Sequence, residues 1–405
     1  MAEYTWAFDR SFLVFLLIAF TSMALAEKLR SLIPMPFIYG VIFILGFAFD
    51  LLPKDLLLSA NMIAVGTIAF NVLVVHSGTM VNFRLLRDRW RETLLCLSAF
   101  LILIVLELLI LTPVLGKGLA FLAPGSVVGG GASCAIASRW VTDAHPELAV
   151  FPWLIFMAQG LFSVPVVTWA LKKESRRLLS EQGDAGAGQK ERASGTENGQ
   201  GKARGGVQKK PPLCMRIPDK YKTTPYFLGS IMIATVLNNI LQNTLFSGLN
   251  INPNITALLL GILLGSLGLM DKAPLFRSDS YGLLILGLMG LMANTLANTP
   301  WQAVVAYIPA LLLVFTFSTA VLLLCAAAGA RILGLSHYRA AALLMNCMMG
   351  FPVNDMLIRQ AAALGGTEER QAFLRRELGP VLGIGTMLIS NGLSILAVGI
   401  LVLFV

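Results

Sequence analysis

Three consecutive glycines interrupt one of the most apolar regions of this chain. Gly129–Gly131 lie inside the stretch Gly118–Trp140 and are followed by Ala132, Ser133 and Cys134. Glycine is a weak helix former, and irregular backbone at membrane depth is tolerated only where protein buries it or where it lines a wet cavity. Backbone amides released at such a break can bind an anion beside a helix N-terminus. We therefore predict that these six residues contact a substrate. Close packing between helices through small residues is the alternative.

A second break carries an amide and a carboxylate. It falls in the apolar stretch Ala340–Leu364 and consists of Gly350, Phe351, Pro352, Val353, Asn354 and Asp355. A carboxylate at membrane depth costs about 2.5–3.5 kcal/mol on insertion scales and usually faces a cavity or an ion. Asn354 and Asp355, together with unwound carbonyls, would suit a hard monovalent cation. The residues from Gly350 to Asn354 are predicted to contact substrate as well. In the alternative, Asp355 pairs with Arg359 one helical turn later.

Other polar residues inside apolar runs are candidates for the same cation site. Asn71, Asn346 and Asn391 could ligate the ion, with hydrogen bonding between helices as the alternative. Glu107 is the lone carboxylate of its apolar run, for which we predict a structural role, with a proton relay as the alternative.

Cofactor and enzyme chemistry find little support. The five cysteines lie in separate segments without C-x-x-C spacing, and the three histidines are scattered, so we expect neither disulfides nor a transition-metal site. No metal triad, Ser/His/Asp set or phosphate-binding loop is recognisable, and we predict that the chain is not an enzyme.

The composition indicates a helical membrane protein. The chain has 405 residues, of which 56% are hydrophobic and 13% charged, and its net charge of +9 fits basic cytoplasmic loops better than nucleic-acid binding. Apolar runs long enough to cross about 30 Å of hydrocarbon recur along the chain. The ten predicted spans are Ser11–Ala26, Ile33–Phe49, Leu56–Val75, Thr93–Leu115, Leu148–Leu171, Tyr226–Phe246, Ile255–Leu269, Tyr281–Leu296, Val304–Ala328 and Leu382–Phe404.

The distribution of Lys and Arg predicts how the two broken stretches are placed. If neither crosses and the N-terminus is outside, four of the 31 basic residues face outside: Arg10, Lys54, Lys117 and Arg139. Crossing by either stretch would turn further basic residues outward, against the positive-inside rule. Arms of about ten helical residues reach about 15 Å, half the hydrocarbon depth. We therefore predict two re-entrant hairpins, at about 118–140 and 340–364, whose tips meet near the midplane, with both termini outside.

A polar segment divides the chain into two halves with matching landmarks. Residues 172–222 are rich in glycine and charge, which predicts a disordered cytoplasmic linker between the halves 1–171 and 223–405. Pro36 precedes a span and lies 93 residues before Gly129, and Pro253 precedes a span and lies 97 residues before Gly350. Five spans and one hairpin per half insert the halves in opposite orientation. Inverted repeats with interrupted helices are typical of secondary transporters.

The order of short motifs along both halves resembles the sodium:glutamate symporter family and, more distantly, the 2-hydroxycarboxylate transporters. The resemblance covers nearly the whole chain outside the linker. Its motifs are Ile33-Pro-Met-Pro-Phe-Ile-Tyr-Gly40, Gly66-Thr-Ile-Ala-Phe-Asn71, Gly129-Gly130, Gly261–Gly268, Met345–Pro352 and Gly379-Pro-Val-Leu-Gly383.

The resemblance implies a homodimer in which a mobile transport domain moves against a scaffold domain in an elevator-like manner. It also implies coupling to Na⁺, with glutamate or a related small carboxylate or amino acid as substrate. Both hairpins depart from the family: its glutamate transporters continue the first Gly-Gly with a His-Gly-Thr-like sequence and have Ala-Thr-Pro-Thr in the second hairpin. Another organic anion, such as a 2-hydroxycarboxylate, is therefore an alternative substrate. A channel and a transport-inactive sensor or scaffold are alternative functions.

Overall fold

The computed structural model describes residues 5–29, 32–190, 217–248, 251–349 and 353–405, and within these ranges it contains helices, turns and loops but no strand. The α-helices of the first half are α1 (Phe8–Lys28), α2 (Met35–Ala48), α3 (Leu56–Ser59), α4 (Met62–Thr79), α5 (Phe83–Asp88), α6 (Trp90–Val127), α7 (Gly131–Thr142) and α8 (Phe151–Lys190). Those of the second half are α9 (Thr224–Thr244), α10 (Pro253–Ser266), α11 (Pro274–Arg277), α12 (Tyr281–Ala297), α13 (Trp301–Ala306), α14 (Ile308–Leu333), α15 (His337–Asn346), α16 (Val353–Ala362), α17 (Glu368–Ile384) and α18 (Ser394–Leu401).

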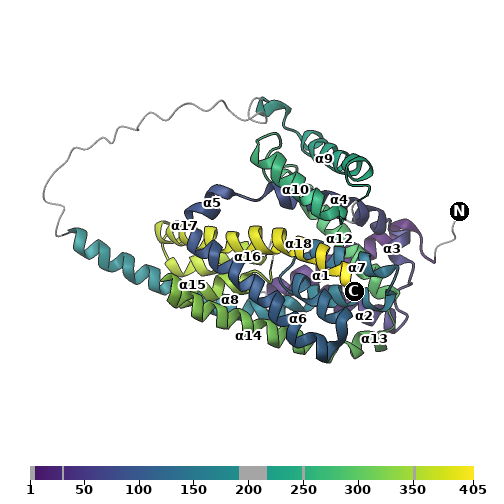
Figure 1. The fold of residues 1–405 in the computed structure, drawn as a ribbon, viewed down its shortest axis with the longest axis horizontal. Helices are drawn as coiled ribbons and strands as arrows, with labels where there is room; N and C mark the ends of the chain where they lie inside the picture. The colour runs from purple at the N-terminus through teal and green to yellow at the C-terminus, as the bar shows by residue number, and fades with distance from the viewer. Residues whose placement is uncertain (1–4, 30–31, 191–216, 249–250, 350–352) are drawn as a thin grey trace.

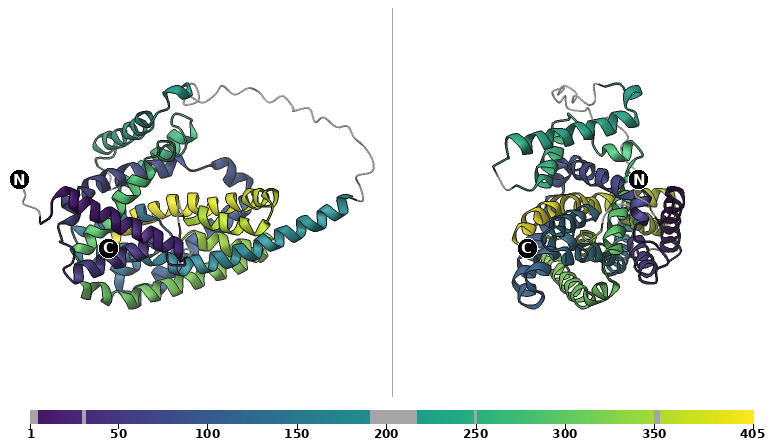
Figure 2. Two further views of the ribbon diagram at one scale, coloured as in Figure 1. Left: turned by 180° about the vertical axis from the view of Figure 1, so that it is seen from behind. Right: turned by 90° about the vertical axis from the view of Figure 1, so that its right-hand side faces the viewer.

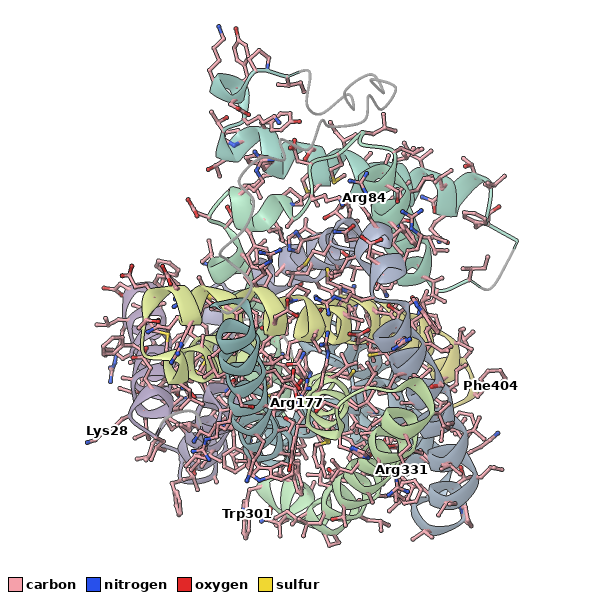
Figure 3. All side chains as sticks on the ribbon, turned by 90° about the vertical axis from the view of Figure 1, so that its left-hand side faces the viewer. Lys28, Arg84, Arg177, Trp301, Arg331 and Phe404 are labelled. Atoms are coloured by element: carbon pink, nitrogen blue, oxygen red, sulfur yellow. The ribbon has the colours of Figure 1, made fainter. Side chains whose placement is uncertain are left out.

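The helices have the lengths and surfaces of a multi-pass membrane protein. Within the described parts of the chain, seven helical segments are long and apolar enough to cross a bilayer, and three shorter apolar helices, α2, α10 and α12, accompany them. Together they occupy the ten predicted spans. Large apolar side chains are exposed on the outer helices, for example Phe20 on α1, Ile233 on α9 and Leu324 on α14, and carbon-rich side chains cover the outside of the helical body (Figure 3). Such a surface suits lipid rather than water, and the chain is an all-α, multi-pass membrane protein.

Two glycines shape the first broken stretch: Gly116 lies just before its start and Gly130 lies at its turn. Gly116 has φ 80°, a left-handed conformation that bends the chain at the end of the first part of α6. Gly130 is extended between the end of α6 and the start of α7. The last part of α6 and α7 both pack along α18, near whose start the turn at Gly130 lies. This is a helix–turn–helix of the predicted kind. That it enters the bilayer without crossing stays a prediction.

The second broken stretch repeats this arrangement against the other half of the chain. Helices α15 and α16 both pack along α8, and Met349 and Val353, the described residues nearest to the break between them, line a cavity. Ser336, just before α15, donates to Glu174 in the later part of α8 (2.6 Å). The first hairpin instead leads through the short helical turn Pro146–Leu148 into the start of α8. The two hairpins therefore approach from opposite ends of α8.

Local backbone geometry is repeated between the halves. Helix α2 begins at residue 35 and α10 at residue 253, while α3 begins at 56 and α11 at 274, an offset of 218 residues in both cases. At the same offset, Asp50 and Gly268 both have a left-handed backbone, with φ of 53° and 68°, and so have Asn61 and Asp279, with φ of 55° and 54°. After both Asp50 and Gly268, the next two amides donate to one carbonyl of the preceding helix. The offset supports the division into two repeats.

Helix α4 packs closely on two helices of the second half. A Cβ at Gly78 would lie 2.4 Å from the carbonyl oxygen of Leu258 on α10, and one at Gly66 would lie 2.5 Å from that of Gly287 on α12. Glycine is required at such close backbone crossings. Figures 1 and 2 show α9 and α10 to one side of the body formed by α6, α8, α14 and the run from α17 to α18.

Two predicted boundaries are wrong. The linker was predicted to begin at residue 172, but α8 continues to Lys190. Local ion pairs and burial support this extension: Arg177 binds Glu174 (2.7 Å) and Glu181 (2.6 Å), and Glu174 is fully buried. Residues 191–216 of the predicted linker lie outside the described residues. The predicted span Leu56–Val75 is instead the short helix α3 followed by α4.

Candidate functional site

A cavity of about 160 Å³ lies where described residues of the two hairpins meet the helices α4, α8 and α12. Its wall is mostly apolar, and the described residues that line it include no Lys, Arg, Asp or Glu. Its polar side chains are those of His76, Ser77, Gln159, Tyr281 and Asn391. A cavity with an apolar wall and a few polar groups is the usual form of a small-molecule site.

The first hairpin contributes the start of α7 to this cavity. Gly130, Gly131 and Ala132 line the wall, and α7 begins at Gly131 without a side-chain cap. The Gly130 amide donates to the carbonyl of Ser390 at 3.4 Å, which holds the turn against the last long helix. The first amides of a helix have no partner within that helix, and the helix dipole favours negative charge there. This part of the wall is suited to an anionic group.

The other predicted contacts of the first hairpin point away from the cavity. The Ser133 hydroxyl hydrogen-bonds that of Ser394 at 2.8 Å, and the Cys134 thiol donates to the carbonyl of Ser126 at 3.6 Å. Both side chains are fully buried and Gly129 packs beside Ser133, so these three residues support the hairpin and do not line the cavity. Helical periodicity is the reason, because residues two and three positions after Gly131 face other sides of α7.

The second hairpin contributes Met349 and Val353 to the wall. The predicted contacts Gly350, Phe351 and Pro352 lie outside the described residues. Val353 begins α16, so a second helix N-terminus, from the opposite half of the chain, reaches the same cavity.

A cluster of amides joins the second hairpin to the last long helix. The Asn346 amide donates to the carbonyl of Leu382 at 2.9 Å and to the hydroxyl of Thr386 at 3.1 Å, and the Asn354 amide donates to Thr386 at 3.0 Å. Asn346 and Asn354 are buried, and the Asn346 side-chain oxygen has no hydrogen-bond partner among the described residues. The cluster lies where the chain becomes a π-helix over Gly385–Leu393, a form that is frequent at functional sites.

The remaining predicted ion ligands lie apart from this cluster. The Asn391 amide lines the cavity and is 3.9 Å from the sulfur of Met80. Asn71 is exposed on α4. The Asp355 carboxylate, 43% exposed, binds Arg359 at 2.5 Å, which is the helical pairing that the spacing allowed as the alternative. That Asp355 and Asn71 bind the ion stays a prediction.

Three residues in or beside the cavity had no sequence signal strong enough to single them out. Thr386 and Gln159 are ordinary polar residues of apolar helices, which usually bond within their own helix. His76 lies in α4 and lines the cavity.

Glu107 lies away from the cavity, between α6 and α14. Its Oε1 accepts a hydrogen bond of 2.5 Å from Ser318, and its Oε2 has no partner among the described residues. The carboxyl is fully buried and ties two long helices together, as a structural role requires. Across the described parts of the chain, no three His, Cys, Asp or Glu side chains are close enough together to hold a metal ion.

Comparison with known proteins gives no family. No family model matches the chain, and no curated protein matches it. The chain is similar to the solved structure of the sodium proton antiporter MjNhaP1 from Methanocaldococcus jannaschii at pH 8, with 15% sequence identity and a TM-score of 0.46 over 98% of this chain and 97% of that chain. Similarity at this level gives no correspondence between residues, and no function is carried over from that antiporter.

Proposed function

We propose that the chain is an ion-coupled secondary transporter of a small carboxylate or amino acid. The observation that carries this proposal is the cavity to which each half of the chain contributes one helix N-terminus, at Gly131 and at Val353. Interrupted helices in corresponding positions of inverted repeats are typical of transporter sites, and their N-termini bind anionic groups of substrates. A channel or a passive scaffold has no need of a cavity between the ends of two such helices.

The coupling ion in this proposal is Na⁺, and the amide cluster is its candidate site. Rotation of the amides of Asn346 and Asn354 by half a turn would direct two oxygens toward the Thr386 hydroxyl and the Leu382 carbonyl. Amide oxygen and nitrogen have nearly the same shape, so each side chain fits in either orientation. In the rotated orientation the Asn354 oxygen gives up the hydrogen bond that it accepts from the Asp355 amide at 2.9 Å and binds the cation instead. Four neutral oxygens can bind a hard monovalent cation, and the unpartnered Asn346 oxygen supports this assignment.

Glutamate or a related carboxylate is the proposed substrate, with a 2-hydroxycarboxylate as the alternative. The cavity has no charged lining residue among those described, so α7 and α16 amides would bind the carboxylate. The homodimer, the elevator-like movement and the placement of both termini outside and of the linker in the cytoplasm are further parts of this proposal.

Uptake into proteoliposomes tests the proposal directly. Vesicles that contain the full chain are offered labelled glutamate, malate or citrate with an inward Na⁺ gradient, and matched vesicles receive K⁺ instead. We expect uptake of at least one of these anions that collapses when the gradient is dissipated. Absence of gradient-driven uptake for all three, in protein that unfolds cooperatively, would rule out this substrate class. Conductance with many ions per opening would favour a channel.

A further inference from the structure

His76 combines burial, a fixed ring orientation and a position in the cavity wall. The side chain is 1% exposed and lines the cavity from α4. Its ring packs against those of Phe276 and Tyr281, with centroids 5.2 and 5.7 Å away. These contacts come from α11 and the start of α12, so the second half of the chain holds in place an imidazole that α4 of the first half carries.

A backbone hydrogen bond determines which ring nitrogen of His76 donates. The Leu275 amide donates to Nδ1 at 3.4 Å, so Nδ1 is an acceptor and the proton of the neutral ring is on Nε2. Nε2 has no hydrogen-bond partner among the described residues. A buried N–H without an acceptor costs free energy and requires an explanation. An acceptor group on a bound ligand would supply the missing partner.

Helix α12 provides a scale for the distance between His76 and the first hairpin. His76 packs on Tyr281, whereas Gly131 lies beside Leu288, where an added Cβ would be 2.7 Å from Cδ2. Seven residues of helix separate these two contacts, a rise of about 10 Å. A hydrogen bond of about 2.9 Å at each end leaves about 5 Å between the two acceptor groups of a ligand. About two or three methylene groups span that distance.

We propose that His76 is a substrate-binding residue whose Nε2–H donates to an acceptor group at the end of the substrate opposite to the carboxylate held by α7. This inference rests on the proposed function and deepens it, because it assigns the residue that recognises the second end of the substrate. His76 then selects molecules with a second acceptor at the correct distance. Substrates of the same length that end in a methyl group leave the imidazole N–H unpaired.

Equilibrium binding to the full chain in detergent tests this role without requiring transport. Isothermal titration in Na⁺ compares glutarate with pentanoate and glutamate with norvaline, pairs in which only the first member has a second carboxylate. The His76→Phe variant keeps an aromatic ring against Phe276 and Tyr281 but removes the donor. The His76→Gln variant keeps an amide donor. Thermal unfolding of both variants monitors folding.

We expect His76→Phe to weaken glutarate and glutamate binding about 10- to 100-fold, the range for a hydrogen bond to a charged group, and to change pentanoate and norvaline binding less than about twofold. His76→Gln should recover part of the loss. Equal loss for both members of each pair, or no loss for either, would overturn the role of His76. No binding of any of the four by the wild type would also overturn it, and the uptake measurement would then decide separately whether the proposed function fails.

Discussion

Replacement of Thr386 by valine should remove the Na⁺ dependence of stability. Valine keeps the branched shape of threonine but has no hydroxyl, so the substitution deletes the atom that accepts from both Asn346 and Asn354. A threonine that bonds only within its own helix provides the comparison. Thr67, whose hydroxyl donates to the carbonyl of Ile63 at 2.9 Å, is therefore the matched control.

The size of the effect follows from the bonds that are lost. The Asn346 amide keeps its bond to Leu382, whereas the Asn354 amide loses its bond to Thr386. One buried donor left unpaired costs about 1–3 kcal/mol, and a second lost bond adds about 1 kcal/mol. Hydrogen bonds between membrane helices average only about 0.6 kcal/mol, which lowers the sum. We expect Thr386→Val to reduce the free energy of unfolding by about 1–3 kcal/mol in K⁺.

Sodium binding makes a second contribution to the free energy of unfolding, which can be measured separately. A ligand that binds only the folded state stabilises it by about 2.7 kcal/mol at 100 times its dissociation constant. Unfolding of the purified protein is therefore measured in K⁺ and across a Na⁺ titration. Wild type and Thr67→Val should both be stabilised by Na⁺, and Thr386→Val should not. If Thr386→Val retained the full Na⁺ effect, the cation would not bind at this cluster.

Two further predictions concern packing and charge. Gly261→Ala should lower the free energy of unfolding by about 1–3 kcal/mol, because its Cβ would lie 2.3 Å from the carbonyl oxygen of Val75. The control Gly282→Ala, which has open space around it, should be neutral or stabilising by up to about 1 kcal/mol. Equal effects of the two variants in chemical denaturation would refute the close crossing. Arg339→Ala should lower the free energy of unfolding by about 2–4 kcal/mol, because it removes a 2.6 Å contact from a Glu92 side chain that is only 6% exposed. The control Arg359→Ala removes a side chain that is 70% exposed and should lower the free energy of unfolding by less than about 1 kcal/mol in the same assay. A similar loss for both variants would contradict the role of burial.

The sequence predicted the breaks in the helices better than the contacts made by their side chains. Glycine and proline act through the local backbone, so the interruptions at Gly129–Gly131 and after Met349 could be located without knowing the fold. The helix–turn–helix over Gly118–Trp140 and the positions of the ten spans follow from the same local information. Gly116 was missed because a single glycine inside an apolar run does not by itself predict a left-handed residue.

Side-chain partners could not be predicted where they depend on distant segments. Thr386 accepts from residues 40 and 32 positions earlier in the chain, and no local pattern indicates this pairing. Ser133 is next to the correct turn but faces Ser394, because one helical residue changes direction by about 100°. The later part of α8 looked like linker from its charge, yet buried Glu174 makes it part of the helix.

Directional bonds join both hairpins to the last long helix run of the chain, whereas the cavity wall is joined by apolar contacts. Ser133 bonds Ser394 and Asn346 bonds Thr386, so each such bond ties a hairpin to the last long helix run of the chain. On the other side of the cavity, the Tyr39 hydroxyl donates to the carbonyl of Met289 at 3.3 Å and ties α2 to α12. The contacts between the hairpins on one side and helices α2 and α12 on the other are apolar, as between Gly131 and Leu288. Apolar contacts are non-directional and can be exchanged during sliding, while buried hydrogen bonds cannot be broken without cost. In the proposed transport movement, the boundary between the moving and the fixed helices therefore runs through the cavity, and substrate that bridges α7 and His76 would contact both.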